Sequence, residues 1–196
     1  MKRTLLLLLA ALPVLLCGAR QANADAVTYT DSDTATGSIG GTTFSDALVT
    51  ITFVGNASNV TSIAPGILVN NVGTGTVTIG GVGTFSFTDA LEAFDNQPYV
   101  GAGIADATQG GLVILATSNS AFGTYGLTTA ISPITGTAIY NSAASFPTTD
   151  GSLIITSPGN DSVFTATTTA ATPEPSSMLL LVTGLGLAMA RRRRPV

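Results

Sequence analysis

The chain lacks several side chains on which enzymes depend. Its 196 residues include no histidine, no tryptophan and a single cysteine, and only 9% of them are charged. From Ala22 to Ala190 there is no lysine or arginine, while all eleven carboxylates lie in that stretch. The stretch therefore has no imidazole base, no Schiff-base lysine and no arginine clamp for phosphate. An acidic segment without a basic patch is also excluded as a conventional nucleic-acid-binding domain.

The N-terminus has the three parts of a secretory signal peptide. Lys2 and Arg3 precede an apolar run from Leu5 to Leu16, and Ala22 and Ala24 supply the small residues of a cleavage site. We predict a signal helix over residues 1–24 that signal peptidase removes. An uncleaved anchor is the alternative, although the apolar run is short for a membrane span. Cleavage would remove the only cysteine and with it any disulfide or thiolate chemistry.

Residues 172–196 also have three parts in order. The triplet Pro173, Glu174 and Pro175 is predicted to be extended, because proline cannot donate a helical hydrogen bond and disfavours helix before it. The apolar run from Met178 to Ala190 predicts a short single transmembrane helix once its polar flanks are included. A cluster of arginines ends the run and favours a cytoplasmic C-terminus. These arginines are Arg191, Arg192, Arg193 and Arg194.

This tail resembles the PEP-CTERM sorting signal of bacterial exported proteins. The resemblance covers only residues 172–196, but all three parts are present in the family's order. It implies processing by an exosortase, a membrane-embedded cysteine transpeptidase-like enzyme, in a Gram-negative host that makes exopolysaccharide. It also implies that Pro173, Glu174 and Pro175 are the recognition element. An ordinary tail anchor with a coincidental triplet is the alternative reading.

Residues 25–171 have the size of one domain and are rich in threonine and glycine, which disfavour helices. Apolar and polar residues alternate in segments such as Val49 to Phe53 and Thr76 to Ile79, as in strands with one buried face. Turn signals separate about ten such segments, which predicts an all-β, antiparallel β-sandwich or jelly-roll-like ectodomain. Asp89 to Asp95 is predicted as one or two helical turns instead. A β-solenoid is disfavoured because no fixed repeat is present.

Three groups of polar residues contain acids: Asp31 with Asp33, the set Asp89, Glu92 and Asp95, and Asn160-Asp161. No basic side chain is available nearby in sequence, so these acids must face water, accept hydrogen bonds or bind a cation. Ca²⁺ takes about six to eight oxygen ligands. The weak candidates for such a site are Asp89, Glu92 and Asp95, which would share one side of the predicted helix. Solvated acids that keep the protein soluble are the simpler alternative.

Other activities lack support in the sequence. A two-carboxylate glycosidase is chemically feasible, but the domain has one glutamate and no tryptophan for stacking on sugars. A serine hydrolase would lack its histidine base. Thr-x-Thr pairs such as Thr50 with Thr52 and Thr76 with Thr78 suit an ice-binding face. Such a face needs ranks stacked at one regular period, and the sequence shows no such period.

We therefore predict an exported, non-enzymatic structural protein of the cell surface or extracellular biofilm matrix. Its C-terminal helix would anchor it briefly in the inner membrane before cleavage at the sorting signal. The alternative is an exopolysaccharide-binding module that is assisted by Ca²⁺; no other cofactor is expected. The expected partners are signal peptidase and exosortase during export, and exopolysaccharide afterwards.

Overall fold

The structure is a computed structural model that describes residues 26–142 and 144–169. The described residues lie within one compact unit and contain strands and three short 3₁₀ turns, but no α-helix. The strands are β1 (Ala26–Ile39), β2 (Thr42–Asn56), β3 (Val60–Ala64), β4 (Ile67–Asn70), β5 (Gly73–Ile79), β6 (Gly83–Ser86), β7 (Leu91–Asn96), β8 (Gly101–Asp106), β9 (Leu112–Ser118), β10 (Ile131–Tyr140), β11 (Phe146–Thr148), β12 (Gly151–Pro158) and β13 (Asp161–Thr169). The 3₁₀ turns are η1 (Ala57–Asn59), η2 (Gln97–Tyr99) and η3 (Ser120–Thr124).

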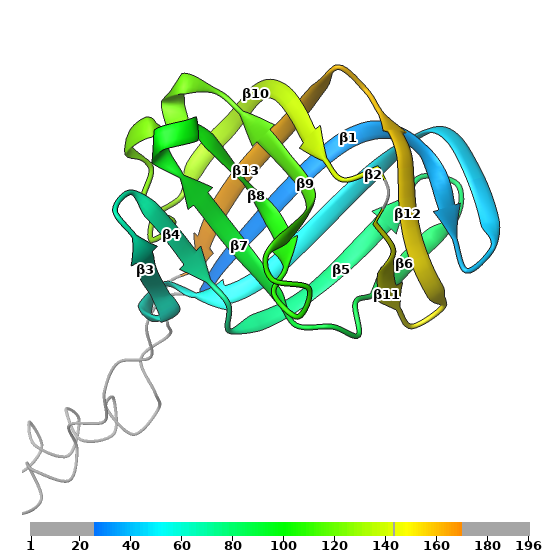
Figure 1. The fold of residues 1–196 in the computed structure, drawn as a ribbon, viewed down its shortest axis with the longest axis horizontal. Coiled ribbons are helices and arrows are strands. Elements are labelled where there is room, and N and C mark those ends of the chain that lie inside the picture. Colours follow the sequence, from blue (N-terminus) through cyan, green and yellow to red (C-terminus); the bar gives the residue numbers. More distant parts are fainter. Residues whose placement is uncertain (1–25, 143, 170–196) are drawn as a thin grey trace, which may run out of the picture. The chain divides into compact units, whose positions relative to one another are not determined.

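The first strand, β1, organises the sheet because it is paired on both edges. It pairs with β2 from Ala26 to Ile39, with a register shift between Ala35 and Gly37. On its other edge, the first half of β1 pairs with β13 and the second half with β12. Both partners run antiparallel to β1, so β12 and β13 follow each other along it like one interrupted strand (Figure 1).

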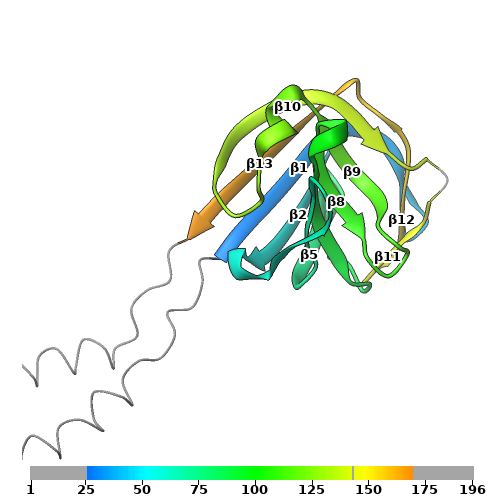
Figure 2. The ribbon, with the colours of Figure 1, turned by 60° about the vertical axis from the view of Figure 1, so that its left-hand side comes forward.

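All thirteen strands belong to one antiparallel sheet. The hydrogen-bonded order is β3-β4-β7-β8-β9-β10-β13-β1-β2-β5-β6, with β11 and β12 attached beside β1. The sheet bends over, so that β7, β8 and β9 lie opposite β1, β2 and β5 (Figure 2). The path does not close, because β3 and β6 stand at its two ends.

The predicted all-β antiparallel architecture is confirmed, but its connectivity is one continuous, bent sheet instead of two separate sheets. The same strand alternation that predicted one buried face is present, for example in β2 from Val49 to Phe53. The predicted signal helix and transmembrane helix lie outside the described residues. Within residues 26–142 and 144–169, no helix is long and apolar enough to cross a membrane.

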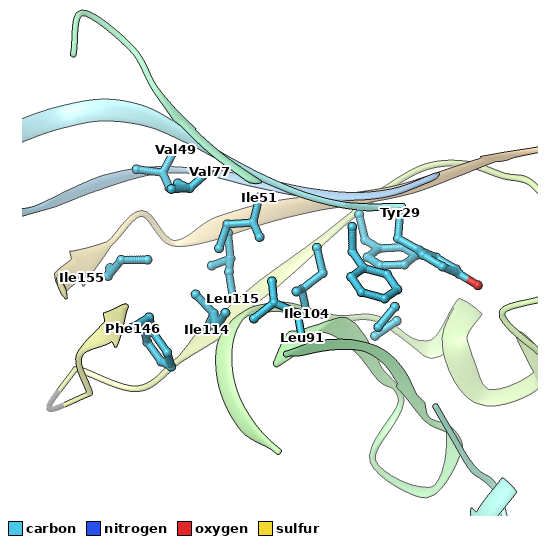
Figure 3. Packing of buried hydrophobic residues seen from close by; sticks show 14 of the residues in the cluster. Tyr29, Val49, Ile51, Val77, Leu91, Ile104, Ile114, Leu115, Phe146 and Ile155 are labelled. Atoms are coloured by element: carbon cyan, nitrogen blue, oxygen red, sulfur yellow. The ribbon is translucent and has the colours of Figure 1, made fainter. Parts of the chain in front are cut away.

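The core fills the space between the two halves of the bent sheet. Val49 and Ile51 of β2 and Val77 of β5 point toward Ile114 and Leu115 of β9 (Figure 3). All five side chains are almost fully buried, and burial of each such side chain contributes about 1.5–3 kcal/mol. Opposite apolar faces of distant strands therefore hold the bend together.

Aromatic rings close one end of this core. Phe164 of β13 lies edge-on to Phe122 of η3, with ring centroids 5.5 Å apart. Phe164 also contacts Tyr125 at 6.0 Å and Tyr29 at 6.5 Å. The cluster fixes the 3₁₀ turn and the loop after it against β1 and β13, since edge-on aromatic pairs add to the burial energy.

The helical prediction for Asp89 to Asp95 is wrong, because Leu91–Asn96 is strand β7. Leu91, Ala93 and Asp95 are buried and alternate with partly exposed residues, a period of two. β7 is hydrogen-bonded to β4 on one side and to β8 on the other. Pairing on both edges satisfies the backbone of an extended segment, which outweighs the local helical preference of Ala, Leu and Glu.

Gly37 is a position where the fold requires glycine. A Cβ atom there would collide with the Ile154 carbonyl oxygen and lie 2.8 Å from the Phe44 ring. We expect Gly37→Ala to lower the free energy of unfolding by about 1–3 kcal/mol, the usual effect of overpacking. Thermal melting monitored by circular dichroism measures it.

Gly126→Ala is the matched control, because the nearest atom to a Cβ atom there is the Thr128 Oγ1 at 3.9 Å. Equal melting temperatures for the two variants would contradict the assigned packing around Gly37.

Candidate functional site

The acids of the Asp31-Ser32-Asp33 motif do not face water. Asp31 points into the core and is fully buried. The Thr117 hydroxyl of β9 donates to it, with oxygen distances of 3.1 and 3.3 Å, and the Ser162 hydroxyl lies 2.7 Å from that of Thr117. Burial raises the pKa of Asp31 well above its usual value, and the Thr117 hydrogen bond offsets part of this effect. The network joins three strands through polar groups inside the core.

Asp33 marks the point where β1 changes partners from β13 to β12. The backbone N–H groups of Thr34 and Gly159 donate to its carboxylate, while Oδ2 has no hydrogen-bond partner. A Cβ atom on Gly159 would lie 2.5 Å from the Asp33 Oδ1, so glycine permits this approach. Burial raises the pKa of Asp33, and the negative charge of Asp161 raises it further. Asp33 thus holds the interruption between the two outer strands.

Asp95 is the least satisfied polar group of the described residues. It is fully buried on β7, and neither of its oxygens accepts a hydrogen bond of normal geometry. Burial raises the pKa of Asp95 to about 7, and the nearby side chain of Gln97 lowers it by less. The Gln97 amide donates to the Tyr125 carbonyl at 2.7 Å. Ionised Asp95 would therefore be a buried charge without compensation.

Asn70 lies diagonally across from Asp95 on the same inner face, because Asn70 pairs with Ala93 and Leu68 pairs with Asp95. Its Nδ2 donates to the Tyr29 hydroxyl at 3.2 Å, and its own Oδ1 has no partner. Asn70 was not among the site residues predicted from the sequence. Its signal was weak, since a single asparagine at the end of an apolar strand is usually read as the start of a turn.

The three predicted Ca²⁺ ligands do not form one group. Their grouping depended on a helix, and in strand β7 the side chains of Glu92 and Asp95 point to opposite faces. Asp89 precedes the strand, and Glu92 lies beside Gly111. Across residues 26–142 and 144–169, no three acidic, histidine or cysteine side chains are grouped so that they could hold a metal ion. Burial raises the pKa of Glu92.

The two described ends of the domain are neighbours. Ala26 begins β1 and pairs with Thr169, which ends β13. The predicted cleavage residues Ala22 and Ala24 precede this pair, and the Pro-Glu-Pro triplet begins four residues after Thr169. These residues, and Arg191 to Arg194, lie outside the described residues. Both processing segments are therefore joined to one end of the same pair of strands.

The strands of the structure and the motif that follows them in the sequence define an all-β domain that precedes a C-terminal processing signal. A model of the PEP-CTERM protein-sorting motif matches residues 171–194. This match confirms the resemblance drawn from Pro173, Glu174 and Pro175, and the chain is an exported protein whose tail makes it an exosortase substrate. No curated protein and no solved structure matches the chain.

The buried acids make stability depend on pH. A carboxyl group whose pKa is raised in the folded state binds its proton more tightly there than in the unfolded chain. Its contribution is complete below the usual aspartate pKa of 3.8 and is lost as pH rises through about 7 for Asp95. We expect the melting temperature to fall between about pH 4 and pH 8, where a tenfold difference in proton affinity is worth about 1.4 kcal/mol.

Asp95→Asn isolates the contribution of Asp95 from those of the other buried acids, Asp31 and Asp33. The amide has the shape of the protonated acid and no charge, so the variant should melt several degrees higher at about pH 8 and show a flatter pH profile. Asp46→Asn, at an exposed position, is the control with the same change in net charge. A profile that remains as steep in Asp95→Asn as in the control would contradict the role of Asp95.

Proposed function

We propose that this protein is a non-enzymatic structural component of the cell surface or extracellular matrix. Its C-terminal helix holds it in the inner membrane until exosortase cleaves near Pro173-Glu174-Pro175. The sorting motif at residues 171–194 is the observation that carries this proposal. Export and sorting follow from the motif, and the matrix role is the step proposed here.

The position of β13 supports processing of a folded domain. Only three residues of the sequence separate Thr169, the last residue of β13, from Pro173. Cleavage at the triplet removes no described strand, since β13 ends at Thr169. The domain can therefore leave the membrane with its sheet intact.

The side chains of the domain support a role without catalysis. Residues 26–169 contain no histidine, lysine or arginine. The acids that are most perturbed, Asp31 and Asp95, are closed inside the core, where a substrate does not reach them. The alternative of a Ca²⁺-assisted exopolysaccharide-binding module has less support, because Asp89, Glu92 and Asp95 are not brought together.

Processing is tested in a host that has an exosortase. Mass spectrometry of the mature protein should find a new C-terminus near Pro173 and no peptide containing Arg191 to Arg194. Replacing Pro173, Glu174 and Pro175 by alanine should leave the tail attached and the protein in the membrane fraction.

Thr169→Ala is the control, because it changes a neighbouring residue and keeps the triplet. An intact arginine tail on the unaltered exported protein would overturn the proposed processing. Normal processing with complete loss of the protein from the matrix fraction would instead overturn the matrix role alone.

A further inference from the structure

The outer face of the sheet carries a regular array of hydroxyl groups. Inward residues of β1, β2 and β5 are buried, and the residues between them point outward and are partly or fully exposed. Cross-strand pairing arranges these outward residues in three ranks of three. We name this set the threonine array: Thr28, Val54 and Thr74; Thr30, Thr52 and Thr76; Ser32, Thr50 and Thr78.

The ranks continue onto the neighbouring strands. On β6, Ser86 pairs with Thr76 and Thr84 pairs with Thr78, whose Oγ1 atoms lie 2.9 Å apart. On β13, Thr165 pairs with Thr30 and extends the middle rank in the other direction, although its hydroxyl donates to the Ile131 carbonyl at 3.1 Å and is left only as an acceptor. The middle rank therefore crosses five adjacent strands, from β13 to β6, and has a hydroxyl on every one.

The array has two regular repeats set by backbone geometry. Neighbouring strands lie about 4.7–4.9 Å apart, and alternate residues along a strand lie about 6.6–6.8 Å apart. Threonine is stiff at χ1 because it is branched at Cβ, so its hydroxyl and methyl positions vary little. Tyr29, Ile51 and Val77 have no exposed surface on the opposite face and hold these strands in place. The surface thus presents hydroxyl groups at the two spacings of a β-sheet, on strands that the core holds in place.

The charged residues of the domain lie outside the threonine array. Nine carboxylates lie between residues 26 and 169, and none is in the threonine array. Asp46 precedes the array on β2, and Asp161 begins β13. An acidic domain with such an uncharged face favours an uncharged ligand. The array also has no aromatic ring, which disfavours stacking on the flat face of a sugar.

We propose that the threonine array binds ice. Each hydroxyl can donate one hydrogen bond and accept others, while each methyl group leaves only a small apolar surface beside it. A single such contact is weak, so affinity requires a ligand that meets many of them at once. Ice is uncharged, consists only of hydrogen-bonding groups, and repeats in two dimensions on the same few-ångström scale as the array. A flexible polymer would match one rank but not the ranks beside it.

The experiment uses the full chain in a non-ionic detergent, with the detergent alone as blank, so it does not depend on processing. Inhibition of ice recrystallisation and partition of the protein into a growing ice crystal are measured. The unaltered chain should inhibit recrystallisation and enter the ice. Thr52→Lys places a long charged side chain in the middle of the array and should abolish both effects.

Thr61→Lys is the matched control, because Thr61 is an exposed threonine on β3, outside the array. It should behave like the unaltered chain. Circular dichroism checks that both variants fold. If Thr52→Lys does not fold, Thr76→Val decides instead, because it removes one hydroxyl and keeps the shape; it should weaken inhibition measurably.

Three results would overturn the proposal. The first is an unaltered chain without any effect on ice, and the second is equal activity in the folded array and control variants. The third is retention on an insoluble neutral polysaccharide that Thr52→Lys abolishes while ice growth is unaffected. That last result would assign the array to a carbohydrate ligand and leave the proposed processing and matrix role untouched.

Discussion

The fold depends on the pairing of β1 along both of its edges. β2 covers one edge from end to end, and β13 and β12 share the other. Because side chains alternate along a strand, this central position divides β1 into an inner row that ends in the core and an outer row of hydroxyls. The neighbouring chain ends at Ala26 and Thr169 follow from the same pairing, since β1 and β13 are the first and last strands.

The inner row includes two acids that have no basic partner anywhere in the described domain. Asp31 is satisfied by the hydroxyl of Thr117, and Asp33 by backbone N–H groups at the interruption beside Gly159. A buried acid without a cation is tolerated when donors surround it or when it keeps its proton. The oxygens of Asp95 accept no hydrogen bond of normal geometry, and burial raises the pKa of this acid to about 7, so protonation removes its charge more readily than that of an ordinary aspartate. The absence of lysine and arginine therefore shapes the interior as well as the surface.

The outer row of hydroxyls on β1 faces the surroundings of the exported domain. Before processing, the domain is joined to its sorting signal through the end of β13, and the outward side of β13 carries Thr165 in the middle rank of hydroxyls. The sorting signal follows β13, and the threonine array begins on β1, the strand that is paired with β13. The sheet links the two by geometry, although the sorting motif itself carries no information about the ligand of the domain.

The sequence by itself determined the sorting signal and the fold class. Linear motifs such as Pro173-Glu174-Pro175 are read as extended segments, and strand alternation is a local property, so neither needs a tertiary structure. The helical prediction for Asp89 to Asp95 was wrong because pairing with β4 and β8 overrode helical preference. Only the tertiary structure decided which acids are buried and that Thr30, Thr52 and Thr76 stand in one rank. The reason is physical: strand register joins residues far apart in the chain, and a shift of one residue would turn each of them to the other face.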